Sequence, residues 1–228
     1  MNTFINVFVA VYAALFPIVN PLGAAPIFLN VVRRCSPEAR NRIAGKVAIY
    51  GFLLLFFSML IGAKVLLFFG ISLPVLRVAG GLVVATVGWR LLNQDQTPVD
   101  HTAGAAGDDA AAIEQSFYPL TLPLTVGPGT IATAIALSTG PAAVLDQQFA
   151  PLGPAFIEEA GGAVAGLAAI ALSVYFAFRE AATIERVIGR TGTSVLVRLF
   201  AFILFAIGIQ ITWLGVHDLI ADLKPLAP

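Results

Sequence analysis

The sequence predicts an all-α polytopic membrane protein, with six transmembrane helices arranged as two inverted repeats of three helices. The composition is the first reason: of 228 residues, 58% are hydrophobic and 11% are charged, and the mean hydropathy is +0.90. A soluble domain has about 25% charged residues. Six apolar runs are long enough to cross about 30 Å of hydrocarbon, and the first and fourth of these runs carry similar Pro/Gly interruptions.

The N-terminal apolar run has no basic segment before it and continues past the length of a signal-peptide core, so we expect it to remain as the first span. The second and third spans are joined by the short hairpin "FGISLP". The whole chain is expected to form one transmembrane domain with repeat one at about 1–92 and repeat two at about 117–228. The six expected spans are residues 4–32, 47–70, 74–92, 117–139, 160–178 and 196–220.

Between the third and fourth spans, residues 93–116 are acidic and rich in Ala and Gly. This segment has no periodic apolar face to bury, so we expect a mobile surface loop that acts as a tether. His101 lies in this loop and is expected to have no functional role.

Basic residues set the expected orientation, because Lys and Arg resist translocation across the membrane. They gather in the first and fifth connections, which share one side when six spans are counted, and Arg90 joins them. The opposite side has only Lys64, Arg77 and Lys224 near it. We therefore expect an inner (plasma) membrane protein with both termini outside and cytoplasmic basic connections, which contain Arg33, Arg34, Arg40, Arg42, Lys46, Arg179, Arg186 and Arg190.

An internal repeat relates the two interruptions. A shift of 106 residues lays the second half on the first with the Pro/Gly breaks in register, and a weaker match at an offset of 121 lays "LRVAGGLVVA" on "VRLFAFILFA". With three spans in each half, the halves enter the membrane from opposite sides, which is typical of inverted-repeat transporters. The matched pairs are Tyr12 with Tyr118, Pro17 with Pro123, Gly23 with Gly129, and Arg77 with Arg198.

The interruptions "LFPIVNPLGAAPIF" (15–28) and "TLPLTVGPGTIATA" (121–134) predict two broken helices, because Pro lacks a backbone donor and Gly permits unusual conformations. Unpaired backbone inside a membrane is tolerated only within the protein or beside water. The broken ends offer N–H groups to a carboxylate, and carbonyls to an ammonium or cation. We therefore expect the breaks to meet at a site for a small zwitterion, with Asn20, Pro21, Gly23, Thr121, Thr125, Gly127, Pro128, Gly129 and Thr130 as candidate residues.

Each candidate has a structural alternative. The breaks could be kinks filled by neighbouring helices, and the threonines could bond back to their own helix carbonyls. Gln210, in the middle of the sixth span, either lines the site or forms an interhelical hydrogen bond. Arg77 and Arg198 either gate two mouths of a pathway or anchor helix ends at the interface.

Three ionisable residues, Lys64, His217 and Asp218, are assigned to the surface. Lys64 is expected to extend its stem towards water, and the neighbours His217 and Asp218 are expected to be solvated, although a proton-linked role for this pair is an alternative.

Several function classes find no support in the sequence. The net charge is +0, so overall charge gives no reason to expect a nucleic-acid partner. Cys35 is the only cysteine, so no disulfide can form within one chain. A metal-ligand cluster, a nucleophile–base pair and a phosphate loop are all missing, which disfavours an enzyme. No Asp or Glu lies near the middle of an expected span, so Na⁺ coupling, or none, is favoured over a carboxylate proton relay.

The motifs "NPLGAAPIF" followed by a basic loop, "R-x-A-G-G" at residues 77–81, and "FYPLTLPLTVGPGTIA" resemble those of the MarC family of inner-membrane proteins. The resemblance covers all six spans. It implies a fold similar to that of the LysE-type exporters, and it implies transport of small neutral amino acids, the activity associated with an archaeal member. The residues themselves, and not the resemblance, favour Na⁺ as a coupling ion or no coupling ion at all, and no other cofactor is expected.

We therefore expect a secondary transporter of small neutral amino acids, whose substrate binds between the discontinuous first and fourth spans. The alternatives are a channel-like facilitator or ion pathway, and a non-transporting membrane partner subunit. The expected partners are the zwitterionic substrate and the lipid bilayer. The oligomeric state is left open by the sequence.

Overall fold

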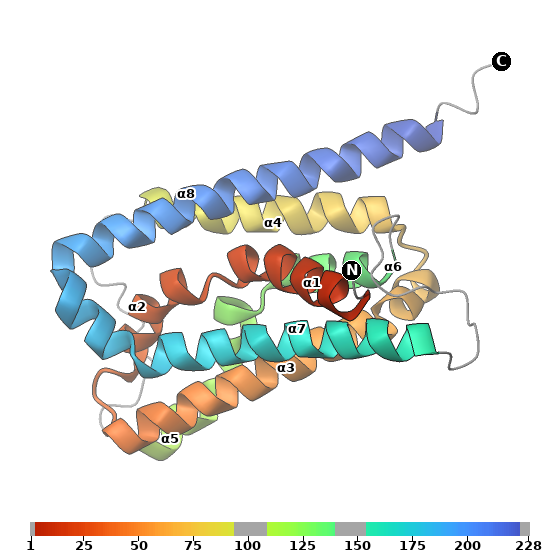
Figure 1. The fold of residues 1–228 in the computed structure, drawn as a ribbon. Helices are drawn as coiled ribbons and strands as arrows, with labels where there is room; N and C mark the ends of the chain where they lie inside the picture. Colours follow the sequence, from red (N-terminus) through yellow and green to blue (C-terminus); the bar gives the residue numbers. More distant parts are fainter. Residues whose placement is uncertain (1–2, 94–108, 140–153, 224–228) are drawn as a thin grey trace.

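The computed structural model describes residues 3–93, 109–139 and 154–223, and the regular elements within these ranges are all helical (Figure 1). This all-α architecture confirms the predicted fold class. The elements in chain order are α1 (Thr3–Val19), α2 (Pro21–Val32), α3 (Pro37–Phe68), α4 (Leu73–Asn93), α5 (Asp109–Glu114), the π-helical segment η1 (Ser116–Thr125), α6 (Pro128–Thr139), α7 (Pro154–Arg179) and α8 (Ala181–Leu223).

Among the described residues, four helical stretches are apolar and long enough to cross a membrane on their own: Pro37–Phe68, Leu73–Asn93, Ile157–Arg179 and Thr191–Ala221. The bent pairs α1–α2 and η1–α6 bring the number of candidate spans to six if each pair counts as one, and their bends are 42° and 67°. The first and fourth predicted spans are therefore both broken, at the positions that the Pro/Gly motifs indicated.

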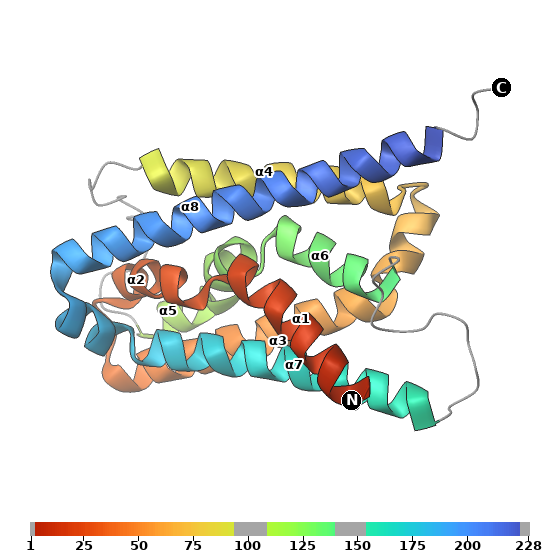
Figure 2. The same cartoon turned by 45° about the horizontal axis from the view of Figure 1, so that its top comes forward.

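The helices form three layers, with α4 and α8 on one side, α3 and α7 on the other, and the broken helices between them (Figures 1 and 2). Elements that correspond in the two halves run in opposite directions: α3 opposes α7, and α4 opposes α8. Their contacts also correspond. The α1–α7 contact is matched by the η1–α3 contact, and the α2–α8 contact is matched by the α6–α4 contact. This is the pattern that an inverted repeat predicts.

The helix ends agree with the repeat found in the sequence. A shift of 106 residues lays Val19, the last residue of α1, on Thr125, the last residue of η1. The helices that follow, α2 and α6, each have 12 residues. The two breaks are therefore at equivalent places in their halves.

Both basic connections contain more helix than the sequence analysis expected. Helix α3 begins at Pro37 rather than near residue 47, because the Ser36 hydroxyl accepts a hydrogen bond from Ala39 N and proline suits the first helical position. Helix α8 begins at Ala181 rather than near residue 196. It bends at Gly189, whose φ of 74° and ψ of 168° are accessible mainly to glycine.

The prediction of a wholly mobile loop at 93–116 is wrong for its last part. Residues 109–114 form α5, and Asp109 accepts hydrogen bonds from Ser36 N at 3.1 Å and Ser36 Oγ at 2.6 Å. These bonds hold the pKa of Asp109 below its usual value, while Ala112 and Ile113 pack against the core. Residues 94–108, which include His101, lie outside the described residues.

Close approach of α4 and α8 depends on glycines from both helices. A β-carbon on Gly208 of α8 would overlap the backbone of Ala85 in α4, and one on Gly81 would overlap Thr212. Gly88 and Gly215 make equally close contacts farther along the same pair. Small residues at such positions let helix backbones pack directly on each other in a membrane.

We predict that Gly208→Ala destabilises the protein, since the added methyl group must push α4 and α8 apart. Overpacking of this kind costs about 1–3 kcal/mol, and thermal unfolding of the purified protein in detergent measures it. Gly45→Ala in α3 is the matched control, because its β-carbon would meet nothing closer than Tyr175 at 4.0 Å. Equal melting temperatures for the two variants would contradict the close-packing interpretation.

Candidate functional site

The first break is centred on Asn20, between α1 and α2. Asn20 is buried and has a left-handed backbone conformation, with φ 48° and ψ 59°, which Asn tolerates better than most residues. Its Oδ1 accepts a hydrogen bond from Gly23 N at 3.1 Å and so caps the start of α2. A β-carbon on Gly23 would overlap the Asn20 amide. Asn20 and Gly23 therefore form one unit that ends α1 and begins α2 at Pro21.

The second break lies between η1 and α6, at Val126 and Gly127. Within η1, Tyr118 and Leu122 have extended backbone conformations, as expected for residues that precede proline. These extended residues interrupt the regular helical hydrogen bonds. Val126 has an extended conformation as well (φ −118°, ψ 96°), and α6 then starts at Pro128.

Two buried threonines donate hydrogen bonds to backbone carbonyls of η1 itself. Thr121 Oγ1 donates to Ser116 O at 2.7 Å, and Thr125 Oγ1 donates to Leu120 O at 2.8 Å. The alternative that these threonines bond back to their own helix therefore describes this structure. A hydroxyl has one proton to donate, so each threonine retains only its capacity to accept a hydrogen bond.

Gly129, in the first turn of α6, lies directly against α4. A β-carbon at this position would overlap Val84 Cγ2 and lie 3.0 Å from Gly80 O. The neighbouring Thr130 is buried. The "GPG" motif thus allows the start of α6 to approach α4, and Gly80 and Val84 complete this contact.

The ends of α1 and η1, the first halves of the two broken helices, border one small cavity. The other candidate residues at the breaks do not line it, and these are Asn20, Pro21, Gly23, Thr121, Gly127, Pro128, Gly129 and Thr130. Val19, at the end of α1, lines it together with Thr125 and Val126 of the second break. The cavity volume is about 10 Å³, which is room for about one water molecule. The remaining lining residues come from α3 and α7 and are Val47, Ala48, Gly51, Phe52, Leu55, Leu167, Ile170, Ala171 and Val174.

The proposed gating arginines lie at opposite ends of the α4–α8 pair and have different surroundings. Arg77 is mostly buried and forms an ion pair with Asp218, near the C-terminal end of α8. Asp218 was expected to be simply solvated, and its pairing with Arg77 corrects that expectation. Arg198 is exposed on α8. The Arg77–Asp218 contact fits the alternative reading of Arg77 as a helix-end anchor.

Gln210 does not lie at the breaks, contrary to the expectation that it lines the site. Its side chain is exposed on α8, on the side away from α4. It also makes no interhelical hydrogen bond within the described ranges. The sequence indicated its depth along the span but could not indicate which way the helix faces.

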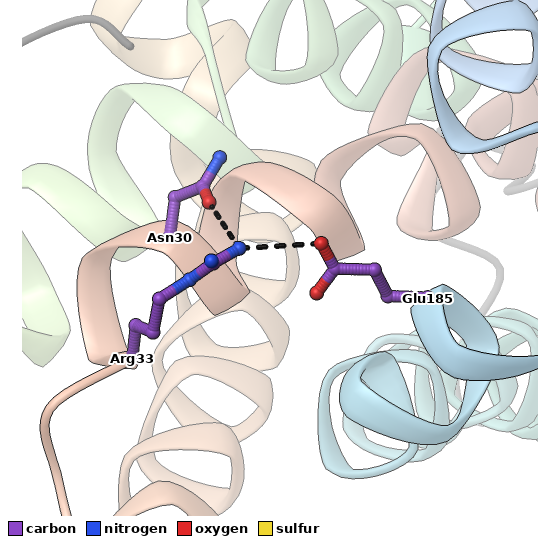
Figure 3. Close-up of polar contacts among 3 residues, drawn as sticks. All are labelled: Asn30, Arg33 and Glu185. Carbon is purple, nitrogen blue, oxygen red and sulfur yellow. Dashed lines mark hydrogen bonds and ion pairs between the residues drawn. The ribbon is translucent and has the colours of Figure 1, made fainter. Parts of the chain in front are cut away.

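At the end of the molecule that carries the basic connections, α2 and α8 are joined by polar contacts. Arg33 Nη2 donates to Asn30 Oδ1 at 3.0 Å and to Glu185 Oε1 at 3.2 Å (Figure 3). An open pocket of about 360 Å³ lies here, lined by Arg33, Ala182, Glu185, Arg186 and Gly189. Asn30 and Glu185 are not among the functional residues that the sequence predicts. The spacing of Asn30 and Arg33 on one helix face was a usable signal, whereas nothing in the sequence links Arg33 to Glu185.

A metal centre is not supported in the described ranges, where no group of three or more His, Cys, Asp or Glu side chains could hold an ion.

These features define a class: polytopic α-helical membrane proteins with one broken helix in each of two oppositely oriented halves. The chain belongs to the MarC family of integral membrane proteins, whose family model matches residues 5–220. The inner membrane protein MarC of Escherichia coli K12 is 31% identical over 210 residues, which cover 90% of this chain and 92% of that protein. The MarC proteins of strains O1:K1 and SMS-3-5 are 31% and 30% identical over the same coverage. No solved structure matches this chain.

The relatives also bear on location. They are described as inner membrane proteins, and the chain has several helices apolar enough to span a bilayer. Together these findings support a multi-pass location in the inner membrane.

We predict that Asn20→Gly retains most of the stability of the protein, whereas Asn20→Ala loses about 1 kcal/mol or more. Both variants lose the side-chain cap, but glycine is a better cap residue than alanine and adopts a positive φ without cost. Thermal unfolding in detergent compares the two. Equal losses would show that the left-handed backbone is not what selects Asn20.

A second prediction concerns the contact between α6 and α4. Gly129→Ala is expected to destabilise the protein by about 1–3 kcal/mol, because the new methyl group overlaps Val84. Val84→Ala removes the overlapping methyl groups, so the double variant should lose less stability than the sum of the two single losses. Additive losses in a double-mutant cycle would mean that these two positions do not share this contact.

Proposed function

We propose that this protein is a secondary transporter of small neutral amino acids, such as glycine and alanine. The observation that carries the proposal is that the ends of α1 and η1, one from each of two oppositely oriented halves, border one cavity. Binding sites of inverted-repeat transporters lie near the membrane midplane between discontinuous helices. The substrate would bind between the ends of α1 and η1 and the starts of α2 and α6.

The chemistry of the breaks suits a zwitterion. The starts of α2 and α6 carry the positive ends of helix dipoles, which favour a carboxylate. Thr125 borders the cavity, and because its proton is donated to Leu120 O, its hydroxyl can only accept. An acceptor of this kind suits the substrate ammonium or a Na⁺ ion. The apolar cavity lining favours substrates with small, uncharged side chains.

The size of the cavity favours a carrier over a channel-like facilitator. A cavity of about 10 Å³ holds about one water molecule, so an amino acid can enter only if the surrounding helices move. Movement of one half against the other would open the breaks to each side of the membrane in turn. We further propose that the basic end faces the cytoplasm and that both termini are outside, in agreement with the distribution of Lys and Arg.

We predict that glycine or alanine raises the melting temperature of the purified protein, and that Thr125→Val weakens this binding by about 10-fold to 150-fold. The range corresponds to the loss of a hydrogen bond to a charged group, about 1.5–3 kcal/mol. A thermal-shift titration with each amino acid, in Na⁺ and in K⁺, measures affinity and ion dependence together.

Thr121→Val is the matched control for this titration. Thr121 makes the same kind of bond to its own helix as Thr125 but does not line the cavity. Equal effects of the two substitutions would contradict a direct role of Thr125. A protein that shows no shift with any amino acid, and no amino acid flux in proteoliposomes, would favour the non-transporting subunit instead.

A further inference from the structure

Gln210 is a polar residue in an apolar setting. It lies within the membrane-spanning stretch Thr191–Ala221 of α8, and its side chain is exposed. Its neighbour Gly208 packs against Gly81 and Ala85 of α4, and Gly80 of α4 packs against Pro128 and Gly129. Gln210 is therefore at about the depth of the second helix break, well inside this apolar stretch.

The amide of Gln210 has no hydrogen-bond partner within the described ranges. Two N–H donors and one carbonyl acceptor would therefore face hydrocarbon, where water cannot satisfy them. An unpaired amide in an apolar medium is costly, so this side chain is expected to be covered in the assembled protein by a group that can both donate and accept.

A continuous seam of exposed residues passes through Gln210. Its members follow one another at alternating steps of four and three residues, the spacing with which one helix packs along another. Gln210 is the central member, and the small side chain of Ala206, one turn before it, permits close approach. The seam residues are Leu199, Ile203, Ala206, Gln210, Trp213, His217 and Ile220, and all of them are exposed.

We propose that this seam is the interface of a homodimer, in which α8 of one copy packs along α8 of the other and the two Gln210 amides bond to each other. Copies of one chain insert with the same orientation, so a twofold axis along the membrane normal makes the two α8 helices parallel. Equivalent residues then meet at the axis. An amide is complementary to itself, because the carbonyl of each copy accepts from the amino group of the other.

The position of the polar residue also fixes the register of the interface. Apart from His217, two turns nearer the C-terminal end, Gln210 is the polar member of the seam, and its amide meets the amide of the other copy only when the two helices are in register. The seam lies opposite the α4-facing side of α8, so the dimer would leave the α4–α8 contact and the broken helices unobstructed. The inference is independent of what the protein transports.

Disulfide cross-linking in native membranes tests the interface. In a Cys35→Ser background, single cysteines at Ala206 and Gln210 are expected to give dimers on oxidation. A cysteine at Ile209 is the matched control, since Ile209 is also exposed and at the same depth but lies about 100° around the helix from Gln210. Cross-linking at Ile209 as efficient as at Ala206 and Gln210 would overturn the proposed seam.

The role of the amide is tested separately by the dimer dissociation constant, measured for labelled protein at varied dilution in lipid bilayers. Gln210→Leu should raise this constant roughly 10-fold, from the loss of two interhelical hydrogen bonds, while Gln210→Asn should retain part of the affinity. A wild-type protein that stays monomeric in bilayers at all dilutions would refute the dimer. If Gln210→Leu alters transport without altering the dissociation constant, Gln210 acts inside the pathway and the proposal is wrong.

Discussion

Every backbone group that leaves a helix inside hydrocarbon must find another hydrogen-bond partner, and this requirement accounts for most of the central structure. At the first break the Asn20 side chain accepts a hydrogen bond from Gly23 N, and at the second the hydroxyls of Thr121 and Thr125 donate to the carbonyls of Ser116 and Leu120 in η1. These side chains stabilise the breaks from within. Their polar character is therefore explained by the backbone before any ligand is considered.

Packing around the breaks follows from the same requirement. Lipid chains are as apolar as side chains, so helices in a bilayer are held together by close van der Waals contact rather than by exclusion of water. Glycines provide that contact where α6 meets α4 and where α4 meets α8, since a β-carbon on Gly129 or Gly208 would overlap the facing helix. The broken helices are thus enclosed by layers that tolerate little change in side-chain volume.

The sequence predicted the features that depend on local chemistry. Proline and glycine indicate the two breaks, and the 106-residue shift that aligns them also aligns the helix ends Val19 and Thr125 in the structure. Features that depend on the facing of a helix could not be predicted in this way. The sequence places Gln210 in the middle of the sixth span, as the structure does, but it cannot show which way the side chain points. This span has no polar face that would mark which side of the helix is turned towards the protein.

Long-range polar contacts were equally inaccessible to sequence reasoning. The ion pairs of Arg33 with Glu185 and of Arg77 with Asp218 join residues that are distant in the chain, and no local pattern encodes such a pairing. The helical residues 109–114 were missed because their docking depends on Ser36, a helix-capping residue in another connection.

The Arg33–Glu185 ion pair in Figure 3 is an electrostatic contact, unlike the van der Waals contacts that glycines allow between α4 and α8. Arg33 and Glu185 are partly exposed, with 52% and 28% of their side chains accessible, and an ion pair in such a position contributes at most about 1 kcal/mol and weakens with added salt. Close packing joins the halves between α4 and α8 and also between α1 and α7, where a β-carbon on Gly162 or Gly166 would overlap α1, whereas the Arg33–Glu185 contact at the basic end is ionic and partly exposed. Added salt should therefore loosen the contact of Arg33 with α8 at the basic end, while the glycine contacts between helices, which carry no charge, keep their strength.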